Sequence, residues 1–595
     1  MKIHLRRDFA AGLFFVAVAL SCSTPAFAQT KESNAEVKFS ARTELVLIPV
    51  LVTDKSGAHI GGLKHEDFTV LENGSEKKVA TFDEITSDPK RLSRPRNPNE
   101  FSNSVPGDSS TRRVTLIVLD MINTPFIDQT YARKELLKYL VESLNRREPT
   151  GLYALDRSGI HVIHDFTVDP DVLIAAVHKV RGDAYQMVDT PEDMEMLTGS
   201  ASPEGSAGDI GTSGASGGVN TRGGQAGSAA AVASQVQQEA NRMQSMIEDQ
   251  ALNFQSFQQR LAITYTLQGL QQVAQALAGF PGRKSLIWAS GGFPFSVSDT
   301  TMQLAPAGRD SLTDVLPLYE RTWQLLNDAQ IALYPVDVKG LQGNTPGASI
   351  RMPSMPNRKP GGYTRRANWQ QGETQSSFET FAAATGGRAY YNSNDLVKGF
   401  RDAVRDSAQY YMLGYYLDKS DTKPGWRKLS VKVKRDHANV RARSGFFVTK
   451  ISADSEASHD SDIASALKSP LDYTAIALNG HWEPTEASQE PGKKRVVYRV
   501  DLPPDPAFID ANDKNHVAFD LVATATTPDG LQANHSTLKK IDFYPTPELL
   551  AKIREKGMGA RGALDLAPGE YTVRIVVRDN LTGRVGSVAA PLKVE

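Results

Sequence analysis

Hydrophobic positions in the middle of the chain form short continuous runs separated by longer amphipathic stretches. The runs VTLIVL at 114–119, KSLIWA at 284–289 and IALYPV at 331–336 are apolar throughout, as expected of strands buried on both faces. GLYALD and GIHVIHDF, separated only by Arg157-Ser158, predict one hairpin. Helical periodicity fills the intervals at 129–146, 169–180, 267–278, 311–327, 378–384 and 395–407. The pattern predicts an α/β fold with a mostly parallel, doubly wound sheet.

The regions on either side alternate apolar and polar residues with a period of two, which is typical of antiparallel strands. Residues 36–86 predict a small N-terminal β-rich domain of the sandwich type, and residues 411–450 predict strands appended to the α/β region. Residues 465–595, which include YTVRIVVRD and SVAAPLKV, predict a C-terminal Ig-like β-sandwich. The Pro-, Ser- and Asn-rich stretch at 87–110 is interpreted as a linker, and 452–462 as a polar break.

Two insertions interrupt the α/β region, which we assign to residues 111–410. The first, 183–262, begins with a Gly-, Ser- and Ala-rich part that predicts disorder, and continues into a Gln-rich stretch that predicts a protruding helix. The second, 344–377, is a basic loop. A solvated loop is the favoured interpretation of its cations, and contact with an acidic partner is the alternative; the cations are Arg351, Arg358, Lys359, Arg365 and Arg366.

The first 28 residues have the pattern of a secretory signal: basic residues, a short apolar run, and Ala26-Phe27-Ala28 before Gln29. Cleavage near Ala28 would leave an extracytoplasmic protein, periplasmic or secreted. The chain's one cysteine, Cys22, lies inside this signal, so a mature thiol nucleophile, thiolate ligand or disulfide is not expected. No later stretch has the roughly 20 apolar residues of a membrane helix, so no transmembrane segment is expected in the mature chain.

Composition narrows the classes of partner. The 595 residues include 67 basic and 68 acidic side chains, for a formal net charge of −1. This balance gives no long-range attraction to nucleic acid, so a nucleic-acid partner is not expected. The oligomeric state does not follow from the sequence.

Several sequence segments, quoted next as phrases of the one-letter sequence, resemble those of a known protein family. They occur in order over about residues 41–448: VTDKSGAHIGGLKHEDFTVLENG, RRVTLIVLDMINT, LAGFPGRKSLIWASGGFPF, LNDAQIALYPVDVKGL, ATGGRAYYNSNDLVKGF with YYMLGYYL, and RKLSVKVKR with VRARSGFF. In these phrases and in its order of elements the chain resembles the von Willebrand factor A-type (VWA, VWFA) related proteins of acidobacteria. The resemblance implies a Rossmann-like VWA sheet with flanking β-sandwich domains.

The resemblance also implies a metal-ion-dependent adhesion site, in which Mg²⁺ or Mn²⁺ is held by hydroxyl and carboxylate oxygens at the carboxyl ends of the strands. Asp120 and Thr124 occupy the outer positions of the expected Asp-x-Ser-x-Ser loop, but Ile122 replaces its middle hydroxyl, and Asn123 could supply an oxygen instead. The second-loop threonine would be Thr264 or Thr266. Ser290 stands where the family's second aspartate is expected, so the predicted site is degenerate.

Two functions from different classes follow. The first is binding or scaffolding of an unidentified protein partner in the cell envelope or outside the cell, through the carboxyl-end rim of the sheet, with or without a cation. The second is an envelope hydrolase with Asp120, His164 or Asp165 as acid or base. No convincing catalytic triad or ligand spacing supports it. Strand alternation places His161 and His164 on opposite faces, which argues against a metal shared by the two. Binding without catalysis is therefore the prediction.

Overall fold

The computed structural model describes residues 45–86, 99–103, 114–144, 148–180, 226–293, 295–298, 301–304, 315–341, 375–406, 408–417, 425–448, 456–505, 508–509, 514–535 and 538–595. The expected signal peptide, the Gly-rich part of the first insertion and the basic loop up to residue 374 lie outside these residues. Among the described residues, no helix combines the length and the apolar character needed to cross a membrane.

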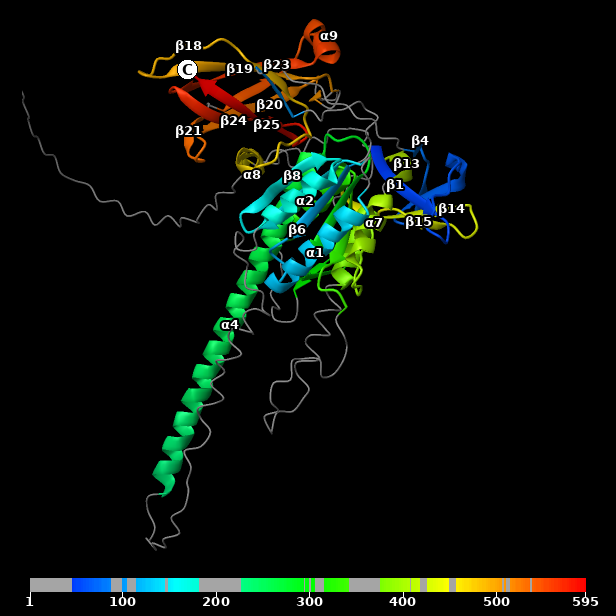
Figure 1. Cartoon of the computed structure of the whole chain (residues 1–595), viewed down its shortest axis with the longest axis vertical. Helices are drawn as coiled ribbons and strands as arrows, with labels where there is room; N and C mark the ends of the chain where they lie inside the picture. The colour runs from blue at the N-terminus through cyan, green and yellow to red at the C-terminus, as the bar shows by residue number, and fades with distance from the viewer. Residues whose placement is uncertain are drawn as a thin grey trace, which may run out of the picture. The chain divides into compact units, whose positions relative to one another are not determined.

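A five-stranded sheet forms the centre of the α/β domain (Figure 1). Its four parallel strands have neighbouring partners in the order β12, β9, β6, β7, and β8 adds an antiparallel edge next to β7. This topology confirms the mixed α/β class and the predicted hairpin. The strands are β6 (Val114–Asp120), β7 (Thr150–Asp156), β8 (Gly159–Thr167), β9 (Lys284–Ser290) and β12 (Ile331–Asp337). A two-stranded hairpin, β10 (Phe295–Ser298) and β11 (Thr301–Leu304), follows β9.

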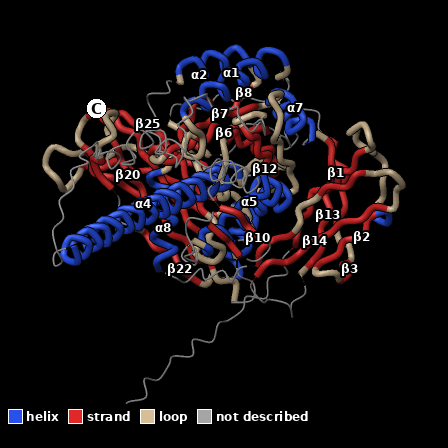
Figure 2. Tube along the Cα trace, turned by 90° about the horizontal axis from the view of Figure 1, so that it is seen from below, coloured by secondary structure: helices blue, strands red, loops and turns tan. Residues whose placement is uncertain are grey.

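Helices cover both faces of this sheet, which explains why β6, β7, β9 and β12 are buried along their whole length. Figure 2 shows α1 and α2 on one side of β6 and β7, and α4 and α5 on the other. The first face packs against α1 (Phe126–Glu142), α2 (Pro170–Lys179) and α7 (Leu396–Asp406). The second packs against α4 (Ala226–Leu277), α5 (Leu316–Asp328) and a helix at 375–385.

Helix α4 combines two helices that were expected to be separate, the protruding helix of the insertion and the helix at 267–278. It runs without a break from Ala226 to Leu277, so the helical part of the 183–262 insertion is continuous with the helix that packs on the sheet. Buried side chains such as Ile263 and Leu267 anchor its C-terminal part. Between the helix at 375–385 and α7, the chain adds a single parallel bridge, from Tyr390 to Val336 at the edge of the sheet.

Two cations are buried where β9 begins, at the opposite end of the strand from Ser290. Lys284 is 2% exposed and its Nζ donates a hydrogen bond of 2.6 Å to the carbonyl of Ala329, just after α5. The neighbouring Arg283 is 1% exposed and donates to the carbonyl of Gly386 at 2.6 Å. Burial lowers the pKa of Lys284 to about 7, because the charged ammonium loses its hydration.

The N-terminal strands and the strands after α7 build one β domain together. β1 pairs with β13, and β2 pairs with β14, so the residues expected as appended strands complete the N-terminal sheets. The two sheets have the orders β15-β1-β13-β4 and β16-β14-β2-β3, and they share one apolar core. The elements are β1 (Leu45–Thr53), a 3-10 turn (His65–Asp67), β2 (Phe68–Glu72), β3 (Ser75–Lys77), β4 (Thr81–Thr86), β13 (Gln409–Tyr416), β14 (Gly425–Val433), β15 (Asn439–Arg441) and β16 (Gly445–Val448).

The C-terminal domain consists of two antiparallel sheets around a second core. One sheet has the order β18-β19-β17-β5 with β23 also on β19, and the other has the order β21-β20-β24-β25 with β22 also on β20. Helix α8 occupies residues 456–462, where a polar break was expected, so that prediction was wrong for this part; residues 452–455 lie outside the described residues. The elements are α8 (Glu456–Lys468), β17 (Asn479–Trp482), β18 (Glu486–Ala487), β19 (Lys494–Leu502), β20 (Val517–Thr526), β21 (Gln532–His535), β22 (Lys539–Phe543), α9 (Pro547–Lys556), β23 (Met558–Leu566), β24 (Gly569–Asp579) and β25 (Val585–Val594).

Part of the expected 87–110 linker is structured instead. β5 (Glu100–Ser102) pairs with β17 of the C-terminal domain. The next residue, Asn103, is buried, and its side chain donates to the carbonyls of Tyr473 and Ile476 at 2.6 and 2.8 Å and accepts from the amide of Leu478 at 2.7 Å. The chain therefore contributes a strand to the C-terminal domain before it enters the α/β domain.

Candidate functional site

The candidate site lies at the carboxyl ends of three neighbouring parallel strands. β6 ends in Asp120, β9 in Ser290 and β12 in Asp337. Asp337 is in register with Ser290, and Leu119 is in register with Ala289. A serine thus stands between two aspartates along one edge of the sheet. We call the described residues that directly follow these three strands, 121–125, 291–293 and 338–341, the carboxyl-end rim.

The carboxylate of Asp120 is enclosed by hydrogen-bond donors. Oδ1 accepts from the backbone amides of Ile122 and Asn123 at 2.9 and 3.0 Å. Oδ2 accepts from Nδ2 of Asn123 at 2.8 Å and from Nε1 of Trp288 at 3.1 Å. The hydroxyl of Ser290 lies 2.8 Å from the same oxygen. With 2% of its surface exposed, Asp120 is a buried anchor for the loops after β6 and β9.

The two opposing influences on the Asp120 carboxyl can be separated. Burial raises the pKa of Asp120 above its ordinary value of 3.8, because the charged form loses its hydration. Hydrogen bonds from Asn123 and Ser290 act in the opposite direction, because they stabilise the charged form. The donors therefore offset part of the cost of burying this carboxylate.

Of the four expected hydroxyl residues, Ser290 contacts Asp120 directly, Thr124 and Thr266 contact the loops around it, and Thr264 does neither. Oγ1 of Thr124 accepts from the amide of Gly291 at 2.9 Å, which joins the β6 loop to the β9 loop. Oγ1 of Thr266 accepts from Nδ2 of Asn123 at 2.9 Å. Both threonines also donate to a carbonyl one turn earlier in their own helix, Thr266 to Ala262 at 2.8 Å and Thr264 to Arg260 at 2.9 Å, and only Thr266 contacts the Asp120 loop. Because both threonines lie on α4 two residues apart, only one of them can face the rim.

The loops after β6 and β9 are in close backbone contact. A Cβ on Gly291 would lie 2.9 Å from the carbonyl oxygen of Asn123 and 3.1 Å from Cδ of Pro125. Only glycine fits at this position without movement of the neighbouring backbone. The two loops therefore form one rigid platform above the ends of β6 and β9.

This set of contacts fits a hydrogen-bonded carboxylate better than a cation site. A hard cation requires oxygen ligands, whereas four N–H groups are directed at the oxygens of Asp120. Nε1 of Trp288 can only donate, and Asn123 presents its amide nitrogen to Asp120 rather than its oxygen. Among the described residues, no group of three or more His, Cys, Asp or Glu side chains is placed to hold a metal ion.

Asp337 is a rim residue that sequence reasoning missed. It is 5% exposed, and its Oδ1 accepts from the amide of Lys339 at 2.9 Å. Burial raises the pKa of Asp337 from 3.8 to about 6, and the nearby Asp128 adds to the rise. The signal was present in the sequence, because IALYPV is followed by Asp337 just as VTLIVL is followed by Asp120.

The raised pKa of Asp337 gives a pH-dependent stability. The folded state binds a proton more tightly than the unfolded state, so the free energy of unfolding should rise as the pH falls from about 6 towards 3.8. Asp337→Asn should remove this dependence and raise the free energy of unfolding by about 2 kcal/mol at neutral pH. This gain is somewhat smaller than the full free energy that corresponds to the pKa shift. Urea denaturation of both proteins over this range measures the effect. A wild-type pH profile that Asp337→Asn leaves unchanged would contradict the assignment.

The residues considered as alternative acids or bases do not join this site. His164 and Asp165 lie on β8, which β7 separates from β6. His164 contacts the carbonyl of Asp165 through Nδ1 at 2.6 Å. His161 pairs with Asp156 at 2.9 Å, within the hairpin that joins β7 to β8. These contacts are local to the hairpin.

Exposed apolar side chains lie in the rim or directly beside it. Phe126 opens α1 directly after the Asp120 loop and is 49% exposed. Leu341 follows β12 and is 60% exposed. The amide of Leu341 donates to Oδ1 of Asn394 at 2.8 Å, and the hydroxyl of Tyr131 donates to the carbonyl of Asn394 at 3.0 Å, so this part of the rim is tied to α1.

No protein-family model matches the chain, and a search of curated proteins gives no significant match. The resemblance to VWA-related proteins therefore stays a prediction.

Proposed function

We propose that the chain is an exported, VWA-type binding protein whose carboxyl-end rim docks a protein partner. The observation that carries the proposal is the combination of a rigid polar base and exposed apolar groups in the rim. Asp120 holds the loops after β6 and β9 in place through buried hydrogen bonds. Phe126 and Leu341 expose apolar surface to solvent. Protein interfaces favour such preformed surfaces, because little conformational entropy is lost on binding.

The same contacts favour a docking mode that needs no cation. Mg²⁺ or Mn²⁺ could reach Asp120 only if N–H donors were displaced from its oxygens. We therefore expect millimolar Mg²⁺ or Mn²⁺ to leave the melting temperature of the wild-type chain unchanged. A ligand that binds only the folded state must raise this temperature. A metal-dependent rise that Asp120→Asn abolishes would therefore contradict the cation-free mode and support docking through a bound cation.

The partner surface can be tested with charge substitutions on exposed side chains. The double variant Phe126→Asp, Leu341→Asp should lose proteins that the wild-type chain captures from envelope extracts, with or without chelator. Val141→Asp is the matched control, because Val141 is 69% exposed near the other end of α1. Quantitative mass spectrometry compares the three baits. If the rim variant and the control capture the same proteins as the wild type, the rim is not the docking surface.

A further inference from the structure

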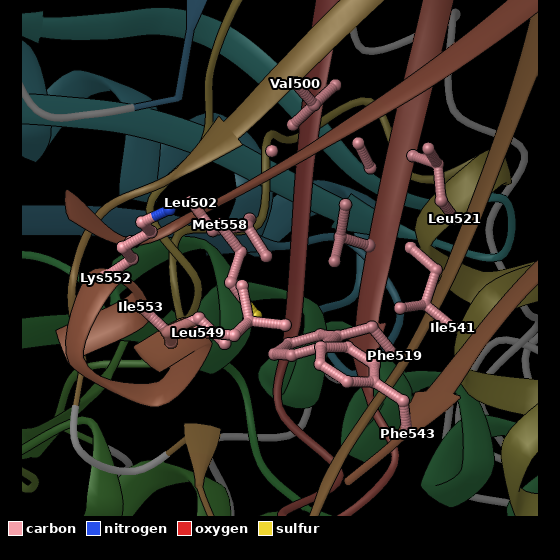
Figure 3. A pocket seen from close by; sticks show the side chains of 14 residues that line it. Val500, Leu502, Phe519, Leu521, Ile541, Phe543, Leu549, Lys552, Ile553 and Met558 are labelled. Carbon is pink, nitrogen blue, oxygen red and sulfur yellow. The ribbon is translucent and has the colours of Figure 1, made fainter. Parts of the chain in front are cut away.

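The C-terminal domain contains an apolar pocket of about 230 Å³ between its two sheets (Figure 3). Alternate residues of three strands line the pocket: Val500 and Leu502 on β19, Phe519 and Leu521 on β20, and Ile541 and Phe543 on β22. Because alternate strand residues share a face, these side chains all point between the sheets. Protein cores seldom leave a void much larger than a water molecule, so a space of this size needs an explanation.

The chain connection across this end of the domain keeps the pocket open. β22 belongs to one sheet and β23 to the other, and α9 joins them. This helix buries only Ile553, and it begins at a Thr546 cap and ends at Gly557, where φ is 78°. A Cβ on Gly557 would lie 1.9 Å from the carbonyl oxygen of Leu502, so glycine is required where the chain turns into β23. The helix therefore covers the pocket without filling it.

The pocket carries one ionisable group, at its edge. Lys552 lies on the exposed face of α9 and is the one charged residue among the fourteen that line the pocket. Figure 3 shows Lys552, Leu549 and Ile553 together on the helix side of the cavity. Among the described residues, Lys552 has no salt bridge within 4 Å. An apolar interior with a single cation at the edge is complementary to a molecule with an apolar tail and an anionic head.

We propose that this pocket binds a single-chain fatty carboxylate of medium length, with the tail between the sheets and the carboxylate on Lys552. An apolar cavity of about 150 Å³ accommodates benzene, so by proportion this pocket has room for about nine carbon atoms. That is the tail of decanoate. The site is separate from the carboxyl-end rim, so its test does not depend on the proposed docking function.

Isothermal titration calorimetry of the full chain with decanoate, below its micelle concentration, tests the proposal. We expect saturable binding of one decanoate per chain. Hexanoate buries four fewer methylene groups and should bind roughly a hundredfold more weakly. A cationic tail of the same length, decyltrimethylammonium, should bind more weakly than decanoate. Absence of saturable decanoate binding would overturn the proposal.

Three variants separate pocket binding from adsorption to the surface. Lys552→Glu should weaken decanoate by at least about tenfold and leave 1-decanol unchanged, because only the charged head contacts this residue. Lys556→Glu makes the same charge change on the same helix outside the pocket lining, and it should have a smaller effect. Ala560→Phe should fill the cavity and abolish the binding of both ligands, with circular dichroism to check folding. Equal loss of affinity with the two lysine variants would refute a carboxylate site at Lys552.

Discussion

Replacing Asp120 by alanine is expected to lower the free energy of unfolding of the α/β domain by about 4 kcal/mol. The substitution leaves the amides of Ile122 and Asn123, and the indole N–H of Trp288, buried without their acceptor. It also releases the hydroxyl of Ser290, which links the β9 loop to Asp120. The prediction is large because several donors lose one shared partner.

Urea denaturation followed by tryptophan fluorescence measures this loss, and hydrogen exchange of peptides from β6 and β9 locates it. Asp120→Asn should lose less stability, because an amide oxygen still accepts some of these bonds. Glu142→Ala, on the exposed end of α1, is the surface control and should stay within about 0.5 kcal/mol of wild type. An Asp120→Ala protein as stable as this control would show that the rim does not depend on the carboxylate.

Replacing Lys284 by methionine is expected to stabilise the protein by about 3 kcal/mol at pH 7. The depressed pKa of Lys284 corresponds to a penalty of at most about 5 kcal/mol, and loss of the hydrogen bond to Ala329 offsets part of the gain. Methionine matches the length of the buried stem and needs no hydration. The gain should be largest at and below neutral pH.

The sign of the pH dependence distinguishes this explanation from simple repacking. The unfolded state binds the Lys284 proton more tightly than the folded state, so the wild-type penalty is fully present below about pH 7 and is relieved as the pH rises towards 10.5. The stability difference between Lys284→Met and wild type should therefore shrink by about 1.4 kcal/mol per pH unit in this window. Lys138→Met, at an exposed position of α1, should show no such trend. A pH-independent gain would mean that packing alone causes it.

The elements predicted best are those whose patterns depend on local sequence. The apolar runs that became β6, β9 and β12 had to be buried on both faces, and this requirement determines the layered α/β arrangement. β5 was missed because it has only three residues in a Pro- and Asn-rich stretch and is stabilised by pairing with β17. The joint N-terminal domain was missed for a similar reason, since alternation identifies a strand and not its partner.

The position of the candidate site was predictable, because the ends of the parallel strands determine which residues come together there. Asp120 and Ser290 come together because neighbouring parallel strands end at the same edge of the sheet. What the sequence could not provide is the direction of the polar atoms. The orientation of the Asn123 amide and the reach of the Trp288 indole depend on tertiary packing, and they favour a hydrogen-bonded anchor over the expected ligand set.

The N-terminal β domain has a consequence for the order in which the chain can fold. The amide of Leu63 donates to the hydroxyl of Tyr411, 348 residues later in the chain, and β1 finds its partner β13 only after the entire α/β domain has been made. If the protein is exported amino terminus first, the apolar strand β1 remains unpaired until its partner β13 has also been translocated. Such contacts slow folding and expose strands to aggregation. If the proposed export is correct, envelope chaperones or proteases should encounter this segment first.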